Sequence, residues 1–343
     1  MPGRPRLSDR FVDVAAAPDA VAAVLDAHDR GDLIGLRTSG TSGGPRSVVR
    51  TTASWFDSFD TVSGLLGLDA SSRVWVPGPP ASTMNLFTAV HAAAMGARLV
   101  RSAADASHAV LTPAALGRVL AQGPRPAGVH LLVAGDRLDR ALRDRALAAG
   151  AARVSHYYGA AELSFVAWGT HADDLVPFPG VEVDTADGQV WVRSPFTFLR
   201  YDGPDGSLVR RADGFMTVGD RGLLTDGRLR VLGRGSDAVV SAGTTVLVAD
   251  VETALEEATG TRPVVVGLPH PDLGQVLCGV APTAEIRDSL KRAARDLEPA
   301  QRPRRWFVVE DLPVTDAGKL DRAALTDRVR EAGEGDRRTV DAP

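Results

Sequence analysis

The chain contains a single cysteine, Cys278, and this scarcity excludes an intramolecular disulfide. Within the run "QVLCGVAP" we expect Cys278 to be a small buried strand residue rather than a nucleophile. The seven histidines are scattered, and none is paired with another at the spacing of metal ligands. The sequence therefore argues against both a disulfide framework and a zinc site.

Long apolar runs are also missing. No stretch approaches the roughly 20 apolar residues needed to cross a bilayer, and the amino terminus lacks the apolar centre of a signal peptide. We therefore expect a cytoplasmic protein without a membrane partner.

A strong charge of one sign is absent as well, since 39 basic and 43 acidic residues give a formal net charge of −4. This balance argues against a nucleic-acid partner, because nucleic acids are bound through clustered basic residues. The sequence also lacks the G-x-S-x-G elbow, so a serine hydrolase has no support.

The pattern of apolar residues predicts an α/β protein. Apolar residues recur at helical spacing in 17–30, 54–67, 85–95 and 136–150, and short strands alternate with helical stretches from residue 98. This alternation predicts a parallel α/β layer. From residue 179 the runs "VEVDTADGQVWVRS" and "GLLTDGRLRVLG" each predict a β-hairpin, and together an antiparallel β subdomain.

The length of 343 residues predicts about two domains. The βα pattern returns after "GRGSD" at 233–237, so we assign 1–235 to a large domain and 236–330 to a small C-terminal domain. The polar run "EAGEGDRRTVDAP" predicts a disordered tail over 331–343.

The run "TSGTSGGPRS" predicts a loop that binds phosphate. Its backbone N–H groups are unshielded and its hydroxyls are close together, which suits an anion. The residues concerned are Thr38, Ser39, Gly40, Thr41, Ser42 and Gly43, followed by Arg46. It is not a Walker loop, because Thr41 stands where lysine is required, and a plain flexible turn remains the alternative.

Separated segments, in order, resemble the motifs of the AMP-forming acyl-CoA synthetase and adenylating-enzyme superfamily. The phosphate-binding run resembles TSGTTGxPKG, "VAGDRL" the adenine-lining segment, "YYGAAE" the YGxTE motif and "DGFMTVGD" the DGWFxTGD motif. "GRGSDAVVSAG" resembles the hinge motif, and "LPVTDAGKLDR" the carboxy-terminal PxTxxGKxxR. The resemblance spans about residues 34 to 325.

The resemblance implies the adenylate-forming enzyme fold, with a large N-terminal α/β domain plus a β subdomain, and a small mobile C-terminal α+β domain. Because the phosphate loop begins at residue 38, the large domain is expected to be amino-terminally shortened, as in short succinylbenzoate-CoA ligases. The implied activity is formation of an acyl adenylate from ATP and a carboxylic acid, followed by acyl transfer.

By resemblance, Glu162 binds Mg²⁺ and Lys319 binds the carboxylate and α-phosphate during adenylation. The ATP-binding residues implied by the motifs are Thr38, Ser39, Gly40, Thr41, Ser42, Gly43, Arg46, Gly135, Tyr158, Asp220 and Arg234. Ser236 is the implied hinge. Without the resemblance to the family, we would interpret Glu162 as an exposed turn residue, Tyr158 as a core tyrosine and Lys319 as a surface lysine.

Several positions depart from the family pattern. Ala161 and Val218 replace threonines, and Arg46 stands where lysine is usual, so the positive charge remains with a different geometry. The histidine-containing element of the acyl pocket is also absent. The residues assigned to that pocket are Ser82, Asn85 and Tyr157, which suit a small polar acid.

The sequence leaves the acceptor open. The leading hypothesis is a ligase that uses ATP and Mg²⁺ and transfers a small acyl group to a thiol, either CoA or the pantetheine of a carrier protein. Transfer to an amine is a variant, and a degenerate nucleotide-binding protein without catalysis is the alternative from another class. Retention of Lys319 argues against the degenerate protein, because simple binding does not require it.

Overall fold

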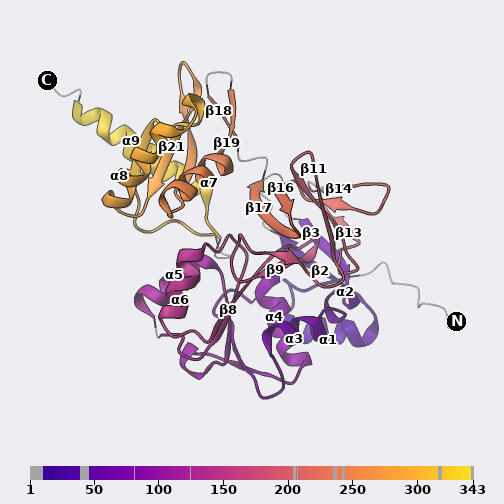
Figure 1. The fold of residues 1–343 in the computed structure, drawn as a ribbon. Helices are drawn as coiled ribbons and strands as arrows, with labels where there is room; N and C mark the ends of the chain where they lie inside the picture. The colour runs from indigo at the N-terminus through magenta and orange to yellow at the C-terminus, as the bar shows by residue number, and fades with distance from the viewer. Residues whose placement is uncertain are drawn as a thin grey trace. The chain divides into compact units, whose positions relative to one another are not determined.

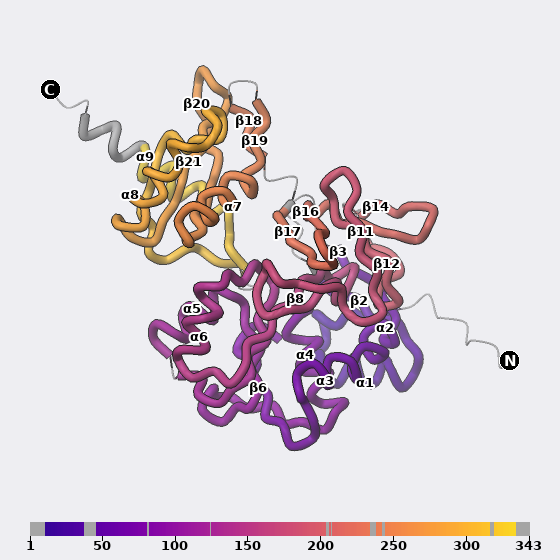
Figure 2. Tube along the Cα trace, viewed as in Figure 1, coloured from indigo at the N-terminus to yellow at the C-terminus, as the bar shows by residue number. Residues whose placement is uncertain are grey.

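The computed structural model of the chain describes residues 11–38, 46–80, 82–123, 125–203, 206, 208–234, 238–241, 244–315 and 319–340. For residues 38, 234 and 334–340 it describes the backbone alone. Contacts divide the chain into a first unit that ends at Val231 and a second that begins at Leu232, whereas the sequence placed the division after residue 235 (Figures 1 and 2). No helix in the described ranges has the length and apolarity of a membrane span.

The first unit contains a mainly parallel sheet with the strand order β10-β9-β8-β7-β6-β4-β5 in the described part of the chain. The strands are β4 (Arg73–Trp75), β5 (Arg98–Val100), β6 (His108–Leu111), β7 (His130–Val133), β8 (Arg153–Ala160), β9 (Ser164–Gly169) and β10 (Val176–Pro177). Pairing is parallel from β5 through β8 and antiparallel for β9 and β10. The predicted parallel α/β layer is confirmed.

Helices cover both faces of this sheet (Figure 1). The helices of the first unit are α1 (Ala20–Arg30), α2 (Ala53–Phe56), α3 (Phe59–Leu66), α4 (Thr83–Ala94), α5 (Pro113–Gln122) and α6 (Arg140–Ala148), with a 3₁₀ turn, η1 (Ala103–Asp105). Of these, α1 and α2 contact a smaller sheet of the same unit. Alternate residues of β7 point to opposite faces. Leu132 packs in the core that includes α3 and α4, and Leu131 and Val133 pack in the core that includes α5 and α6.

Two of the predicted helices differ from the observed ones. The helix predicted over 54–67 is interrupted at Asp57 and Ser58, so that α2 and α3 are separate. The helix predicted over 136–150 begins only at Arg140, because Asp139 caps it: its carboxylate accepts the Leu142 N–H at 2.6 Å.

Two smaller sheets complete the first unit. One has the order β1-β2-β3-β13, formed by β1 (Phe11–Asp13), β2 (Leu33–Thr38), β3 (Arg46–Thr51) and β13 (Arg200–Asp202). The other contains β11 (Glu182–Ala186), β12 (Gln189–Arg193), β14 (Val209–Arg210), β15 (Met216–Thr217), β16 (Asp220–Thr225) and β17 (Arg228–Arg234). Both predicted hairpins are confirmed, with positive φ angles at Asp187 and Gly188 and at Asp226 and Gly227.

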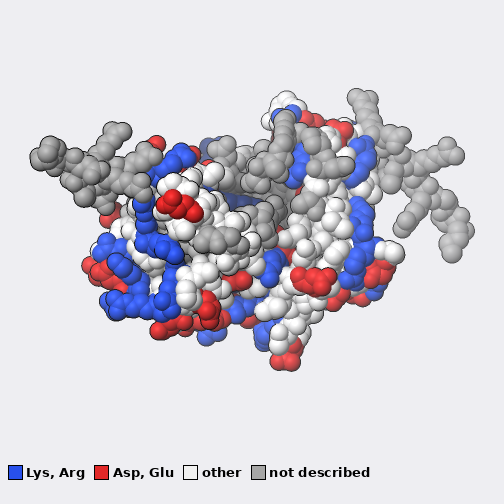
Figure 3. Space-filling view, turned by 90° about the horizontal axis from the view of Figure 1, so that it is seen from above, with Lys and Arg blue, Asp and Glu red and all other residues white. Residues whose placement is uncertain are grey.

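Charged residues of both signs are interspersed on the face seen in Figure 3. In the sheet that contains β11 and β12, Arg193 pairs with Glu182 at 2.5 Å, and Arg211 pairs with Asp213 at 2.7 Å. The Arg211 guanidinium also lies 4.9 Å from the centre of the Trp191 ring. These arginines are thus occupied within the protein.

The second unit is an α+β fold. Its elements are β18 (Ala238–Ser241), β19 (Thr244–Leu247), α7 (Val248–Thr259), β20 (Val264–His270), β21 (Gly274–Ala281), α8 (Ala284–Ala293), η2 (Ala294–Asp296), η3 (Pro299–Gln301), β22 (Arg305–Val308) and α9 (Arg322–Val340). The described strands have the order β19-β18-β21-β20, and β22 pairs in parallel with β21. Cys278 is a buried residue of β21, as predicted, and burial raises the pKa of its thiol to about 11.

The prediction of a disordered tail is wrong for 331–340, because α9 continues to Val340. The packing explains the first part of this difference. Leu325 and Val329 are buried, and a Cβ atom at Gly333 would lie 3.3 Å from Arg305 and 3.6 Å from Phe307. The helix is therefore held against β22 as far as Gly333.

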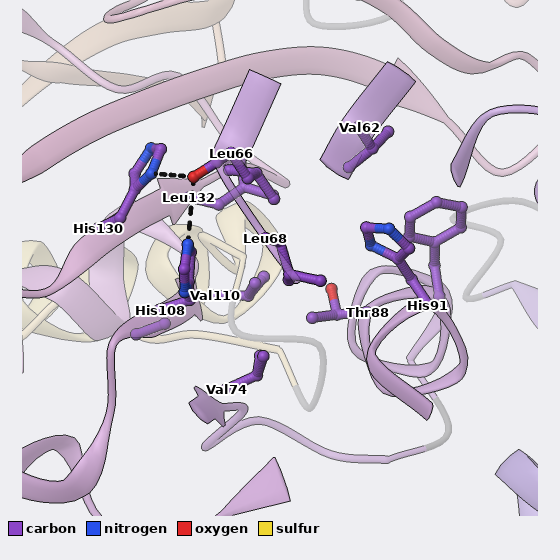
Figure 4. A pocket seen from close by; sticks show the side chains of 12 residues that line it. Val62, Leu66, Leu68, Val74, Thr88, His91, His108, Val110, His130 and Leu132 are labelled. Atoms are coloured by element: carbon purple, nitrogen blue, oxygen red, sulfur yellow. Dashed lines mark hydrogen bonds between the residues drawn. The ribbon is translucent and has the colours of Figure 1, made fainter. Parts of the chain in front are cut away.

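Several histidines lie in or beside the core of the first unit. His108 and His130 both bond to the Leu66 carbonyl, at 3.1 and 2.8 Å, beside a small cavity of about 10 Å³ lined mainly by apolar side chains (Figure 4). His91 reaches the Ser63 hydroxyl at 2.8 Å. The cavity has room for about one water molecule, so it is a packing feature rather than a ligand site.

We expect the free energy of unfolding to fall as the pH is lowered from about 6.5 to about 4. Burial lowers the pKa of His91, His130 and His156 to about 4, below the usual value near 6.5. Between these values the unfolded chain binds more protons, so each histidine favours unfolding by about 1.4 kcal/mol per pH unit. Urea unfolding measured between pH 6.5 and 5 should show a proton uptake that rises as the pH falls and approaches about three protons near pH 5.

The variant His156→Gln should reduce this uptake by about one proton. An unfolding free energy that is independent of pH over this range would contradict the prediction.

Candidate functional site

The predicted phosphate loop connects two paired strands. Leu33–Thr38 and Arg46–Thr51 are antiparallel, and Thr38 is opposite Arg46. Both ends of the loop are thus fixed by the sheet. The residues between them, Ser39, Gly40, Thr41, Ser42 and Gly43 among them, lie outside the described residues.

Arg46 and Glu162 are connected through a residue that the sequence did not suggest. The Tyr201 hydroxyl donates a hydrogen bond to Glu162 Oε1 at 2.9 Å, and the Arg46 guanidinium lies 5.2 Å from the centre of the Tyr201 ring. Tyr201 belongs to β13, which pairs with β3 next to Arg46. Glu162 is only 8% exposed, so the interpretation as an exposed turn glutamate is wrong.

Arg50 is fully buried behind this group. Its guanidinium donates to the Ala161 carbonyl at 3.0 Å, to the Ser164 hydroxyl at 2.6 Å and to the Phe196 carbonyl. Burial lowers the pKa of Arg50 to about 9, and the nearby Glu162 carboxylate opposes the change, so Arg50 stays cationic at neutral pH. The cation thus bonds residues on both sides of Glu162 in the sequence, the Ala161 carbonyl and the Ser164 hydroxyl.

A second tyrosine and carboxylate form a similar pair. The Tyr158 hydroxyl donates to Asp220 Oδ2 at 2.7 Å, which connects β8 with β16. Asp220 is 8% exposed. Gly135 follows β7 at the carboxyl edge of the parallel sheet, with a φ of +88° that favours glycine. Loops at this edge commonly bind ligands in α/β sheets.

The residues assigned to the acyl pocket lie within or after strands of this sheet. The Tyr157 ring lies 4.6 Å from the Phe165 ring and 5.9 Å from the Trp168 ring, and desolvation raises the pKa of its hydroxyl. Ser82 and Asn85 lie at the amino terminus of α4, which follows β4.

Lys319 belongs to the second unit, where its backbone is paired with Thr315. The Thr315 N–H donates to the Lys319 carbonyl at 2.8 Å, and the Lys319 N–H donates to the Thr315 hydroxyl at 3.3 Å. Its side chain is exposed. The chain contains only two lysines, Lys291 and Lys319, among 39 basic residues, so lysine rather than arginine at 319 is an exception in this protein.

Glu252, a buried residue of α7, holds the chain just after Lys319. Arg322 donates to both of its carboxylate oxygens, at 2.9 and 3.2 Å, and to the Val265 carbonyl at 2.9 Å. Arg262 donates to the same carboxylate at 3.0 Å. This network fixes the start of α9 on the sheet of the second unit.

The two residues predicted near the boundary are not described at side-chain level. Arg234 ends β17, and only its backbone is described. Ser236 lies outside the described residues, so its role as a hinge stays a prediction.

No protein-family model matches the chain. Among curated proteins, it is 29% identical over 336 residues to the probable 2-succinylbenzoate–CoA ligase of Mycobacterium tuberculosis, which covers 88% of this chain and 85% of that protein. It is 25% identical over 333 residues to the uncharacterized acyl–CoA ligase YhfT of Bacillus subtilis, and this match covers 86% of this chain and 68% of YhfT.

Solved structures show the same fold. The ATP-bound RpMatB-BxBclM chimera B3 matches with a TM-score of 0.75 and 21% identity, over 88% of this chain and 69% of that one. The amide bond synthetase McbA of Marinactinospora thermotolerans matches with a TM-score of 0.71 and 24% identity, over 88% and 69%. These similarities in sequence and fold support a member of the AMP-forming adenylating-enzyme superfamily. Two of the departures from the superfamily motifs, Ala161 and Val218, can now be placed in the structure.

Both departures fit their surroundings in the first unit. The Ala161 carbonyl accepts a hydrogen bond from Arg50, and this contact does not require a threonine side chain. Val218 is 3% exposed and packs in the main core of the first unit. Each substitution is thus accommodated by local contacts.

The residues present also suit Mg²⁺ in this superfamily member. Glu162 offers one carboxylate, and no group of three or more metal-binding side chains gathers in the described part of the chain. Mg²⁺ is commonly bound by one or two carboxylates together with phosphate oxygens of the substrate. A single glutamate that is connected through Tyr201 with Arg46, at the end of the predicted phosphate loop, fits that donor set.

The sequence did not indicate that Tyr201 and Arg50 contact the site, or that Glu252 forms an ion pair with Arg322. The chain has only three tyrosines, and the two that are not assigned to the acyl pocket each donate to a carboxylate of the candidate site. The small number of tyrosines could therefore have pointed to Tyr201. Arg50, in the apolar run "SVVRTT", was a second signal, because arginine in a buried strand must be paired.

Proposed function

We propose that the chain activates a small carboxylic acid with ATP and transfers the acyl group to a thiol. A carboxylate oxygen attacks the α-phosphorus, the bond to the bridging oxygen breaks, and pyrophosphate leaves with the electron pair. A thiolate sulfur of CoA or carrier pantetheine then attacks the acyl carbon, and AMP leaves. The observation that carries this proposal is the connection of Arg46 with Glu162 through Tyr201, at the end of the phosphate-loop hairpin.

In this proposal the loop 38–43 and Arg46 hold the β- and γ-phosphates, and charge-assisted hydrogen bonds contribute roughly 1.5–3 kcal/mol each. Glu162 holds Mg²⁺, which neutralises phosphate charge when bound. Asp220 accepts the ribose hydroxyls and Tyr158, bonded to it, lies against the adenine. Lys319 donates to the carboxylate and α-phosphate during the first step only.

Transfer to an amine is a second candidate for the acceptor, because the amide bond synthetase McbA shares the fold. A thiol is preferred, because the two curated relatives described above are named acyl–CoA ligases. A degenerate binder is less well supported, since Ala161 and Val218 are accommodated in the structure.

Trapping with hydroxylamine tests the proposal. We expect pyrophosphate release and hydroxamate formation that depend on both ATP and one class of carboxylic acid. Adding CoA, phosphopantetheinylated carrier protein or an amine in place of hydroxylamine then identifies the acceptor. Absence of hydroxamate across a broad panel of acids would favour the degenerate binder.

Arg322 should affect adenylation through Lys319. The variant Arg322→Met removes the bonds from the start of α9 to Glu252 and Val265 but leaves Glu252 paired with Arg262. We expect adenylation to slow about tenfold in kcat, because the lysine is less well positioned, with little change in KM for ATP. Conversion of a synthetic acyl adenylate to thioester should be unchanged.

Arg262→Met is the matched control. Arg262 bonds the same carboxylate, but its other bonds are to Thr253 and Glu256 of α7 rather than to residues near Lys319. Equal slowing of adenylation in the two variants would show that Arg322 has only a structural role.

A further inference from the structure

Two polar side chains at the amino terminus of α4 have buried oxygen atoms without a hydrogen-bond partner among the described residues. They are Ser82 Oγ and Asn85 Oδ1, and Asn85 is only 2% exposed. The orientation of the Asn85 amide is fixed, because its Nδ2 donates to the Pro79 carbonyl at 3.0 Å. Its oxygen is therefore left as an acceptor that lacks a donor. Such atoms are costly unless they have a use.

Ser82 is the N-cap residue of α4, but its side chain does not cap the helix. Its backbone has the extended conformation of an N-cap, with φ −71° and ψ 137°, but its hydroxyl makes no bond to the first turn of α4. The next two helices of the same sheet are capped normally, by Thr112 on α5 and Asp139 on α6. The Ser82 hydroxyl is thus available for another partner.

The position of these atoms connects them with the proposed reaction site. Asn85 lies against the loop after β4, where a Cβ atom at Gly78 would collide with its amide. β4 and β8 are parallel strands of one sheet, so the loop after β4 that Asn85 contacts and Glu162, which follows β8, lie at the same edge of that sheet.

We propose that Ser82 and Asn85 recognise a hydroxyl or amino group on the acyl part of the substrate, so that the preferred acid is a hydroxy- or amino-substituted carboxylic acid. The substituent donates a hydrogen bond to Asn85 Oδ1, and the Ser82 hydroxyl donates to or accepts from the same substituent. The inference rests on the proposed function, because the acid arrives as the substrate of that reaction.

Asn85 Oδ1 disfavours an anion as the occupant of the site. A carboxylate or phosphate offers only acceptor oxygens, and these are repelled by the acceptor Asn85 Oδ1. An unsubstituted acyl chain leaves both oxygens buried and unpaired, which disfavours its binding. A neutral or cationic donor satisfies both residues.

The first test uses pairs of acids that differ by one hydroxyl or amino group, such as benzoate with its ring-hydroxylated and ring-aminated derivatives, and short aliphatic acids with their hydroxy derivatives. We expect the best substituted acid to exceed its unsubstituted partner by about 10²-fold in kcat/KM for pyrophosphate release. In Asn85→Leu this preference should fall to about threefold or less, since the variant has no acceptor. An equal preference in the wild type and Asn85→Leu would overturn the inference.

Thr88→Val is the matched control for activity. Thr88 lies on the same helix, but its hydroxyl already donates to the Met84 carbonyl at 2.9 Å. We expect this variant to keep the preference of the wild type. Loss of the preference in Thr88→Val as well would mean that any polar change in α4 has this effect, and would also overturn the inference.

The second test does not require turnover and so separates this inference from the proposed function. Asn85 Oδ1 has no hydrogen-bond partner among the described residues, and the Pro79 carbonyl still accepts from the Ser82 N–H at 3.1 Å when the Asn85 amide is removed. Asn85→Leu should therefore leave Tm unchanged or raise it by about 2 °C. Ser82→Ala should likewise leave Tm unchanged, whereas Thr112→Ala, which removes a working cap, should lower it by about 2 °C. A clear loss of Tm in Asn85→Leu would show that Asn85 is a structural residue.

Discussion

Replacing Lys319 with alanine is expected to slow acyl-adenylate formation by about 10²–10³-fold, by analogy with the loss of a donor to charge that develops in a transition state. The ammonium is a compact donor, and this chain uses arginine almost everywhere else. Thioester formation from a synthetic acyl adenylate should stay near the wild-type rate, because we place the lysine in the first step alone. The two half-reactions are measured separately on one preparation.

The other lysine of the chain provides the control. Lys291 is an exposed residue of α8, and Lys291→Ala should leave both half-reactions unchanged. Pyrophosphate release from Lys319→Ala at the wild-type rate would remove this lysine from the mechanism. It would also remove the strongest argument against a degenerate nucleotide-binding protein.

The second large effect is expected on stability. Arg50→Met keeps the apolar stem but removes the guanidinium that bonds the Ala161 and Phe196 carbonyls and the Ser164 hydroxyl. Removing one partner from such a buried charged network typically costs about 3–5 kcal/mol, and we expect a loss of that order in urea unfolding. Adenylation should fall as well in the fraction that remains folded, because the backbone beside Glu162 loses its support.

Arg37→Met, in the neighbouring strand β2, is the matched control. Arg37 pairs with Asp13 at 2.8 Å, but its side chain is 57% exposed, and exposed ion pairs contribute little. If the free energy of unfolding of Arg50→Met equalled that of Arg37→Met, the Arg50 guanidinium would not stabilise the fold, and the prediction would be contradicted.

The sequence predicted best those elements that depend on neighbouring residues. The hairpins at 187–188 and 226–227 follow from Asp-Gly turns, whose residues adopt the positive φ angles that such turns need. The parallel layer follows from the alternation of apolar strands with helices. These signals are local and can be seen without a fold.

The parts that were missed depend on contacts between distant residues. Arg50 bonds residues 111 to 146 positions further along, and Arg322 bonds Glu252 across 70 positions. The local sequence pattern also gave a wrong prediction of disorder for the tail. There α9 continues, because Gly333 allows close packing against β22. Glu162 was identified through its motif, but only the structure connects it with Arg46 through Tyr201.

The products of ATP consumption test the central claim most directly. Phosphorus NMR of a reaction that contains ATP, magnesium and an accepted carboxylic acid should show AMP and pyrophosphate in equal amounts, and neither should form without the acid. Formation of ADP and orthophosphate would contradict the account.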